Sequence, residues 1–163
     1  MKITNSSILI FACLFMTACG GGLVRGQPPL VGMSSLQSQQ TEIQTRVDIY
    51  NPNGVDMMVQ ELEMSMTLGD TDLGSHNIQP GIKIYPNGTE EIGIEFPTMD
   101  AVRQTLADLE SGDINSVPYT IRGRVFDTDG DSEQFSQDGY LYPLPGRPGE
   151  FRGAGPQRDG TRK

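Results

Sequence analysis

Alternation of apolar and polar residues dominates the chain from residue 29 onward. One face of TEIQTRVDIY carries Ile43, Thr45, Val47 and Ile49, and the same period of two runs through ELEMSMTL, EEIGIEF and YTIRGRV. A strand with one apolar and one polar face is typical of an antiparallel sheet that is buried on one side. Short strands divided by turn residues therefore predict an antiparallel β-sandwich of about seven strands over residues 29–145.

One segment departs from this alternation and predicts a short helix. Met99, Val102, Leu106 and Leu109 recur at helical spacing, so that they would share one face of a helix. Asp100 suits the beginning of such a helix and Gly112 its end, which predicts a helix from Asp100 to Ser111 between two strands.

The strand that ends at Tyr50 runs into Asn51-Pro52-Asn53-Gly54. These residue types fit the four positions of a type I turn, with Asn first, Pro second and Gly fourth. Pro52 has no amide hydrogen, so the hydrogen-bond ladder of the strand must stop there. The motif predicts a corner where the chain leaves one strand for the next, and YPNG at residues 85–88 predicts a second turn.

Taken together, TRVDIYNPN, ELEMSMTL, YPNGTEEIGIEFP, the helix and YTIRGRV resemble a WHy (water stress and hypersensitive response) domain of group 2 late embryogenesis abundant proteins, over residues 28–145. The resemblance implies an immunoglobulin- or fibronectin type III-like sandwich with a helix between later strands. It also implies a non-enzymatic role in desiccation and stress tolerance. It offers no catalytic residue, and the positions that match the family motif are expected to be structural: Asn51, Pro52, Asn53, Tyr119 and Gly123.

The first 18 residues predict an export signal. The nine apolar residues of Ile8–Met16 follow Lys2, and they are too few for a membrane-spanning helix, which needs about 20. The stretch MTAC that ends at Cys19 resembles the lipobox of bacterial lipoproteins, which implies cleavage before Cys19 and attachment of acyl chains such as palmitate to it. Residues 19–28 would then form a flexible tether. In a Gram-negative host, Gly20 in place of Asp after Cys19 favours the outer membrane, facing the periplasm, over the inner one.

Charge is distributed unevenly. The formal net charge is -9, with 19 acidic and five basic residues in 41–145 but two acidic and five basic residues in 146–163. So acidic a domain is a poor candidate for binding nucleic acid, which requires neutralisation of phosphates by Lys and Arg. The Gly/Arg-rich segment 146–163 predicts a disordered basic tail, or a weak docking segment for anionic headgroups, cell-wall polymer or the acidic domain itself.

The stretch whose residue types most suggest metal binding is DTDGDSE, with Asp127, Asp129, Asp131 and Glu133. Aspartates at alternate positions resemble the start of an EF-hand loop, but Ser132 stands where that loop requires Gly. A solvated hairpin is the expectation, with these four residues as weak calcium candidates. His76 is the single histidine and falls in the turn-rich LGSHN, where it is expected at the surface.

No set of residues predicts an enzyme, a cofactor or a small-molecule substrate. Two classes of function remain open from the sequence. The first is a membrane-anchored lipoprotein whose domain protects other macromolecules during water loss. The second is a structural or adapter module of the cell envelope, calcium-modulated in one version, which an exposed apolar patch would favour.

Overall fold

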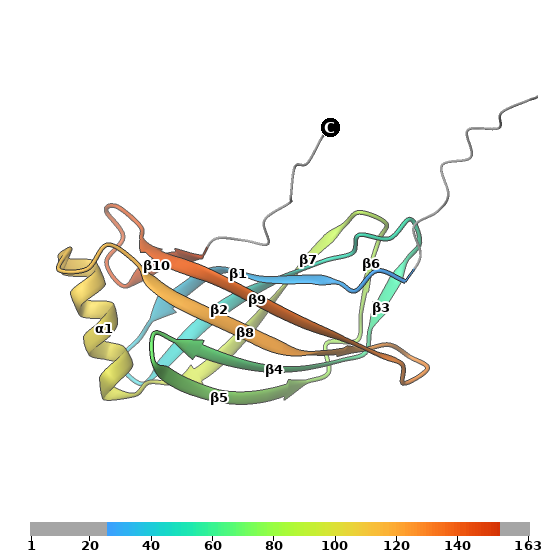
Figure 1. Cartoon of the computed structure of the whole chain (residues 1–163), viewed down its shortest axis with the longest axis horizontal. Helices are drawn as coiled ribbons and strands as arrows, with labels where there is room; N and C mark the ends of the chain where they lie inside the picture. The colour runs from blue at the N-terminus through green and yellow to red at the C-terminus, as the bar shows by residue number, and fades with distance from the viewer. Residues whose placement is uncertain (1–25, 154–163) are drawn as a thin grey trace, which may run out of the picture.

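The computed structural model describes residues 26–153. Within that part of the chain there are ten strands and one helix (Figure 1): β1 (Leu30–Ser38), β2 (Glu42–Tyr50), β3 (Met57–Val59), β4 (Glu61–Leu68), β5 (Thr71–Ile78), β6 (Ile82–Ile84), β7 (Thr89–Pro97), α1 (Asp100–Ser111), β8 (Val117–Phe126), β9 (Ser132–Pro143) and β10 (Glu150–Gly153).

Eight of these strands form a single antiparallel sheet, in the order β5-β4-β8-β9-β10-β1-β2-β7, and β3 and β6 form a separate two-stranded ribbon. The large sheet curls until its two edge strands nearly meet. His76 on β5 lies edge-on to Phe96 on β7, with ring centroids 4.6 Å apart. The expected class, all-β with one short helix, is confirmed, whereas the immunoglobulin-like sandwich of about seven strands is wrong.

The difference has a physical reason: alternation of apolar and polar residues does not show what covers the buried face of a strand. A period of two marks a strand with one buried face, but it is the same whether that face meets a second sheet or the inside of its own curled sheet. Two irregularities add bending. The register shifts between Met33 and Ser35 in β1 and between Ser65 and Thr67 in β4, and such bulges increase local twist.

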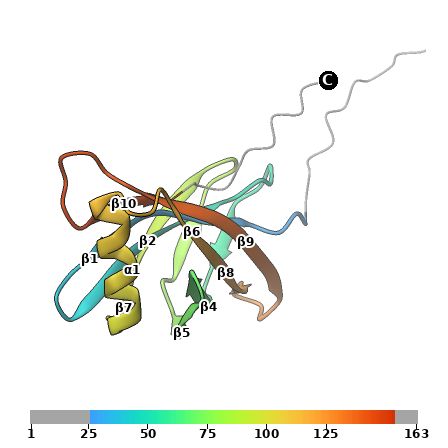
Figure 2. The same cartoon turned by 60° about the vertical axis from the view of Figure 1, so that its left-hand side comes forward.

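The core fills the inside of the curl. Ile43, Val47 and Ile49 are fully buried, as their alternation predicts. Helix α1 has the predicted bounds, ends at Gly112 with φ 86°, and adds its buried apolar face to the same core. It covers one end of the curled sheet, while the β3–β6 ribbon lies at the other end (Figures 1 and 2).

The sheet extends beyond the expected domain boundary at residue 145. Strand β10 lies between β1 and β9, and Phe151 is 1% exposed. The expected disorder of segment 146–163 is therefore wrong for residues 146–153, and residues 154–163 lie outside the described chain. One apolar residue in a four-residue strand gives no periodic signal, but two flanking strands supply hydrogen-bond partners on both sides.

Two glycines of the sheet allow their neighbours to approach closely. A Cβ on Gly123 would collide with the Glu63 carbonyl oxygen of β4 and would lie 2.8 Å from the ring of Phe135. A Cβ on Gly139 would lie 2.5 Å from both Cζ and Oη of Tyr119, which is 2% exposed. The phenol of Tyr119 also shares a hydrogen bond with the Met33 backbone, so its ring is held in place.

We expect Gly139→Ala to destabilise the fold by about 2–3 kcal/mol, because the added methyl group forces the fixed ring of Tyr119 to move within a packed core. The matched control is Gly93→Ala on β7, where no atom lies within 4 Å of the added Cβ. The control should change stability by less than about 0.5 kcal/mol. Urea denaturation of both variants measures this, and equal losses would contradict the packing argument.

Candidate functional site

The Asn-Pro-Asn corner lies at the β3–β6 end of the molecule, opposite α1 (Figure 1). Asn51 is fully buried, and its Nδ2 donates to three backbone carbonyls, those of Val55 at 2.8 Å, Ile84 at 3.1 Å and Tyr85 at 3.2 Å. Its Oδ1 accepts from the amide of Asn53 at 2.9 Å. One side chain thus satisfies the backbone where β2 leaves the sheet and ties it to β6.

The second asparagine of the motif fixes where the chain enters the domain. Nδ2 of Asn53 donates to the carbonyl of Gln27 at 3.0 Å, and the amide of Gln27 donates to Oδ1 of Asn53 at 3.1 Å. These two reciprocal hydrogen bonds resemble those between residues of neighbouring strands, and they fix the backbone of Gln27 to the corner. Cys19 and the predicted signal peptide 1–18 precede it and lie outside the described residues.

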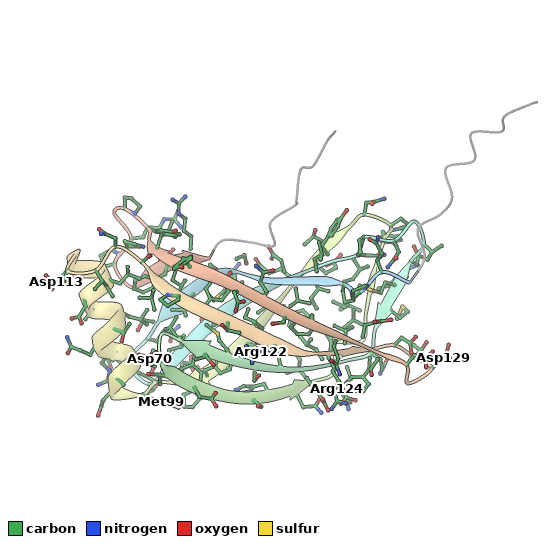
Figure 3. All side chains as sticks on the ribbon, in the orientation of Figure 1. Asp70, Met99, Asp113, Arg122, Arg124 and Asp129 are labelled. Atoms are coloured by element: carbon green, nitrogen blue, oxygen red, sulfur yellow. The ribbon has the colours of Figure 1, made fainter. Side chains whose placement is uncertain are left out.

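The Asp-rich turn joins β8 to β9 at the same end, where Figure 3 labels Asp129. Oδ1 of Asp127 accepts from the amides of Asp129 at 2.9 Å and Asp131 at 3.0 Å, so this carboxylate closes its own turn. Among residues 26–153, no three His, Cys, Asp or Glu side chains converge so that they could hold a metal ion. The structure therefore does not bring the four calcium candidates, Glu133 included, together as a ligand set.

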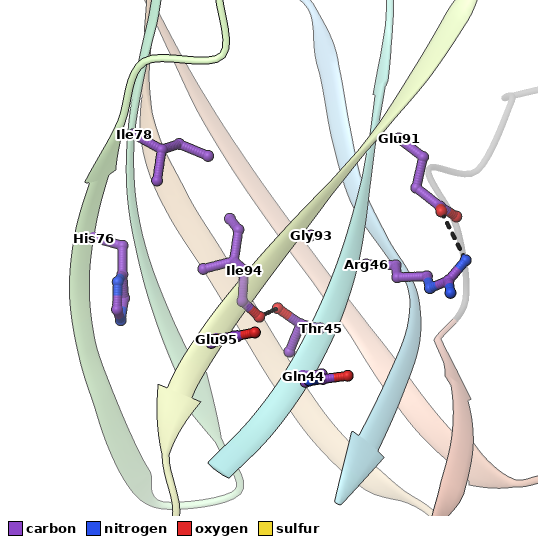
Figure 4. A pocket seen from close by; sticks show the side chains of 9 residues that line it. All are labelled: Gln44, Thr45, Arg46, His76, Ile78, Glu91, Gly93, Ile94 and Glu95. Atoms are coloured by element: carbon purple, nitrogen blue, oxygen red, sulfur yellow. Dashed lines mark hydrogen bonds and ion pairs between the residues drawn. The ribbon is translucent and has the colours of Figure 1, made fainter.

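A groove of about 700 Å³ lies where the curled sheet fails to close (Figure 4). His76 and Ile78 of β5 line one side of it. Glu91, Ile94 and Glu95 of β7 line the other side, and the groove extends over β7 to Gln44, Thr45 and Arg46 of β2. Figure 4 shows Ile78, His76 and Ile94 within the opening, whereas Glu91 stands apart from them beside Arg46 of β2.

Carboxylates gather on the outer face beside this groove. Nη1 of Arg46 pairs with Oε1 of Glu91 at 3.0 Å, and both side chains are largely exposed, so the pair contributes little to stability. Partial burial raises the pKa of Asp48, and the nearby charge of Glu91 raises it further, while a hydrogen bond from Ser34 opposes both. The rim of the groove is thus acidic, with one arginine in it.

Sequence reasoning missed this groove because it misplaced His76. The histidine lies in strand β5 and packs against Phe96, rather than standing on a surface turn. Leu73 and Ile78 both face inward although they are five residues apart, because Gly74 at φ 94° interrupts the alternation. An odd spacing of apolar residues around a glycine was the available signal for a bulged edge strand.

The model of the late embryogenesis abundant protein family LEA_2 matches residues 46–132, more than half of the chain, and the chain belongs to this family. The match includes the Asn-Pro-Asn corner, both edge strands and the Asp-rich turn. No curated protein matches the chain.

Solved structures that are similar to this chain are distant from it in sequence. A solution structure of an Arabidopsis thaliana protein is 15% identical with a TM-score of 0.48, over 76% of this chain and 88% of that one. A crystal structure of an Archaeoglobus fulgidus protein is 9% identical with a TM-score of 0.41, over 72% and 98%. A sporulation control protein of Bacillus subtilis is 9% identical with a TM-score of 0.38, over 71% and 51%.

We expect Asn51→Ala to destabilise the domain by about 2–4 kcal/mol, because it leaves three backbone carbonyls and one amide without their partner in a buried position. Asn77→Ala is the control, since Asn77 donates one exposed hydrogen bond to Glu61, and should cost less than about 0.5 kcal/mol. Thermal and urea unfolding compare the two. Similar losses would mean that the buried network is not what holds the corner.

We expect Asp48→Asn to raise the urea midpoint at neutral pH. The raised pKa of Asp48 means that its charged form destabilises the folded state at pH values above that pKa. Below the ordinary carboxyl pKa of about 4 the group is protonated in both states, so the gain should disappear there. Glu133→Gln, which removes one charge from an exposed position at the beginning of β9, is the control, and an equal gain from it would assign the effect to net charge alone.

Proposed function

We propose that this chain is a non-enzymatic domain that protects other macromolecules during water loss, held at a membrane by a lipid on Cys19. Membership of the late embryogenesis abundant family is the observation that carries the proposal. Its resemblance to the WHy type, through the Asn-Pro-Asn corner and the YTIRGRV strand, supports the association with water stress.

The physical basis of protection would be a folded surface rather than a hydrophilic coil. The described chain encloses one apolar core, and within it the buried side-chain N and O atoms all have hydrogen-bond partners. Outside that core, residues 41–145 carry 19 acidic and five basic residues. A strongly charged surface retains water and repels its own copies, so that it can stand between neighbours without aggregating with them.

The distribution of exposed apolar side chains also favours protection over a protein-binding patch. Among the described residues the large exposed hydrophobic side chains are dispersed: Leu30, Tyr85, Ile114, Tyr140 and Tyr142. Tyr140 and Tyr142 share the outer face of β9, whereas Tyr85 lies beside the corner and Ile114 follows α1. Single exposed apolar residues of this kind are ordinary on a protein surface.

Membrane attachment would place the corner end of the domain toward the bilayer. Cys19 precedes Gln27 by eight residues, and a flexible linker of that length has an end-to-end distance of about 16 Å. Within residues 26–153, no helix has the length and hydropathy that a membrane crossing requires. In this proposal the lipid on Cys19 attaches the chain to the outer membrane, facing the periplasm.

An adapter role in the cell envelope is the second candidate, and the open groove between β5 and β7 is the observation that favours it. Unpaired strand edges bind other chains by extending the sheet. The two roles are compatible, because the groove occupies one seam of the sheet and leaves the rest of the acidic surface uncovered.

We expect deletion of the gene to lower survival of the host through drying and rewetting, with recovery from wild type but not from Cys19→Ala, which removes the lipid attachment. The measurement is colony counts after rewetting. Recovery by Cys19→Ala would separate protection from anchoring, and unchanged survival of the deletion strain would overturn the stress role. Drying a labile enzyme with the purified mature chain, against an unrelated acidic protein, tests protection without the membrane.

A further inference from the structure

The large sheet has two open edges that face each other. Within residues 26–153, β5 pairs with β4 alone and β7 with β2 alone, so each has a second row of backbone N–H and C=O groups without a strand beside it. The strand order alternates in direction from β5 to β7, and the groove lies between these two edges. An open edge of this length is a template for another extended chain.

The inner side of the opening offers apolar contacts. Ile78 on β5 and Ile92 on β7 pack against the core but are only partly buried, unlike the apolar residues of the central strands. Ile94 lines the groove, and its carbonyl accepts a hydrogen bond from Oγ1 of Thr45 at 2.9 Å. An added strand would cover the partly buried Ile78 and Ile92 with its inward-facing side chains.

The charged residues on the outer side of the opening determine which charge a bound segment must carry. The two edge strands carry four acidic residues and no Lys or Arg: Asp72, Glu90, Glu91 and Glu95, of which Glu91 and Glu95 lie on the outer face of β7 and line the groove. Arg46 of β2 also lines the groove and pairs with Glu91, which leaves Glu95 without an ion pair among the described residues. Charge complementarity therefore requires a basic occupant.

We propose that this groove binds an extended, basic segment of a partner polypeptide, which adds as a strand to the free edge of β7. Alternate side chains of the segment point inward onto Ile78 and Ile92, and the intervening Lys or Arg residues point outward toward Glu91 and Glu95. This binding activity goes beyond the protective function and depends on neither the lipid anchor nor stress.

Strand β7 is the better of the two edges for this purpose. Its nine residues pair with β2 in unbroken register, so its backbone is regular along its whole length. The ring of His76 on β5 packs against Phe96, so an added strand would lie beside the residues that precede Phe96. Strand β5 is interrupted by Gly74 and by the register shift opposite Ser65, which bend it. Gly93 at the middle of β7 has no atom within 4 Å of a built Cβ, so its outer face is open to an approaching side chain.

Two other occupants fit less well. A second copy paired antiparallel through β7 about Gly93 would place Glu91 of one chain opposite Glu95 of the other, and like charges across strands are destabilising. The chain's own residues 154–163 are basic, but Ala154 and Pro156 are their only apolar residues apart from glycine. They follow β10, which is separated from β7 by β1 and β2.

The probe is a fluorescent peptide of alternating lysine and valine, about eight residues long to match an edge strand. Fluorescence anisotropy with the mature chain should show saturable binding that weakens with added salt. A glutamate-valine peptide should not bind. A lysine-valine peptide with alternate N-methylated amides keeps the charge and removes backbone donors, and its binding should fall roughly tenfold or more. Equal binding by the N-methylated peptide would overturn strand addition.

Glu95→Lys should weaken binding of the lysine-valine peptide roughly fivefold, whereas Glu133→Lys on β9 makes the same change of net charge away from the groove and should have little effect. Equal effects of the two substitutions would mean that binding depends on the net charge of the chain and not on the groove. Amide hydrogen exchange should slow in residues 89–97 when the peptide binds, and slowing confined to other strands would place the site elsewhere.

Two further outcomes would each identify a different occupant of the groove. Dimerisation of the free chain through the groove, seen by sedimentation and abolished by the peptide, would make a second copy the occupant and overturn the proposal. Tighter peptide binding after removal of residues 154–163 would show that the chain's own tail occupies the groove, and would overturn it equally. All of these measurements are made in solution without drying or lipid, so their failure is distinguishable from failure of the protective role.

Discussion

The buried side-chain amide of Asn51 is the interaction on which one end of this fold depends. Pro52 stops the ladder of β2, and the backbone beyond it must still satisfy its polar groups within the molecule. Asn51 meets that requirement from a single position, with three donated bonds and one accepted bond, and so holds β6 and the following turn against the end of β2. It acts together with Val59 and Ile84, which are fully buried and anchor the β3–β6 ribbon in the core.

The elements of the fold were predictable where a single residue pattern decides them. Helix α1 has its predicted bounds because Val102, Leu106 and Leu109 repeat at helical spacing and Gly112 ends it in a left-handed conformation. The corner at Asn51 was predictable as a turn, because Pro52 cannot continue a ladder. Its buried hydrogen bonds were not, since Val55 is close in sequence but Ile84 and Tyr85 are brought there only by the fold.

The candidate groove was also not predictable from local sequence patterns, because only the fold brings its residues together. It exists because β5 and β7, which are not neighbours in the sheet, are brought face to face when eight strands curl. Glu91 and Glu95 read in the sequence as the polar face of an ordinary strand, and nothing local marks that strand as an edge. Likewise Phe151 gave no signal in a Gly/Pro-rich segment, although two neighbouring strands hold it in the core.

The reciprocal bonds between Gln27 and Asn53 have a mechanical consequence. A pull on the chain that precedes Gln27 first meets this pair and then β1, which is hydrogen-bonded to β2 on one side and to β10 on the other. Force along β1 therefore acts on two ladders in shear, so that many hydrogen bonds share the load at once instead of opening one after another. The chain thus enters the domain through an interior strand of the sheet, and not through one of its edge strands, β5 or β7.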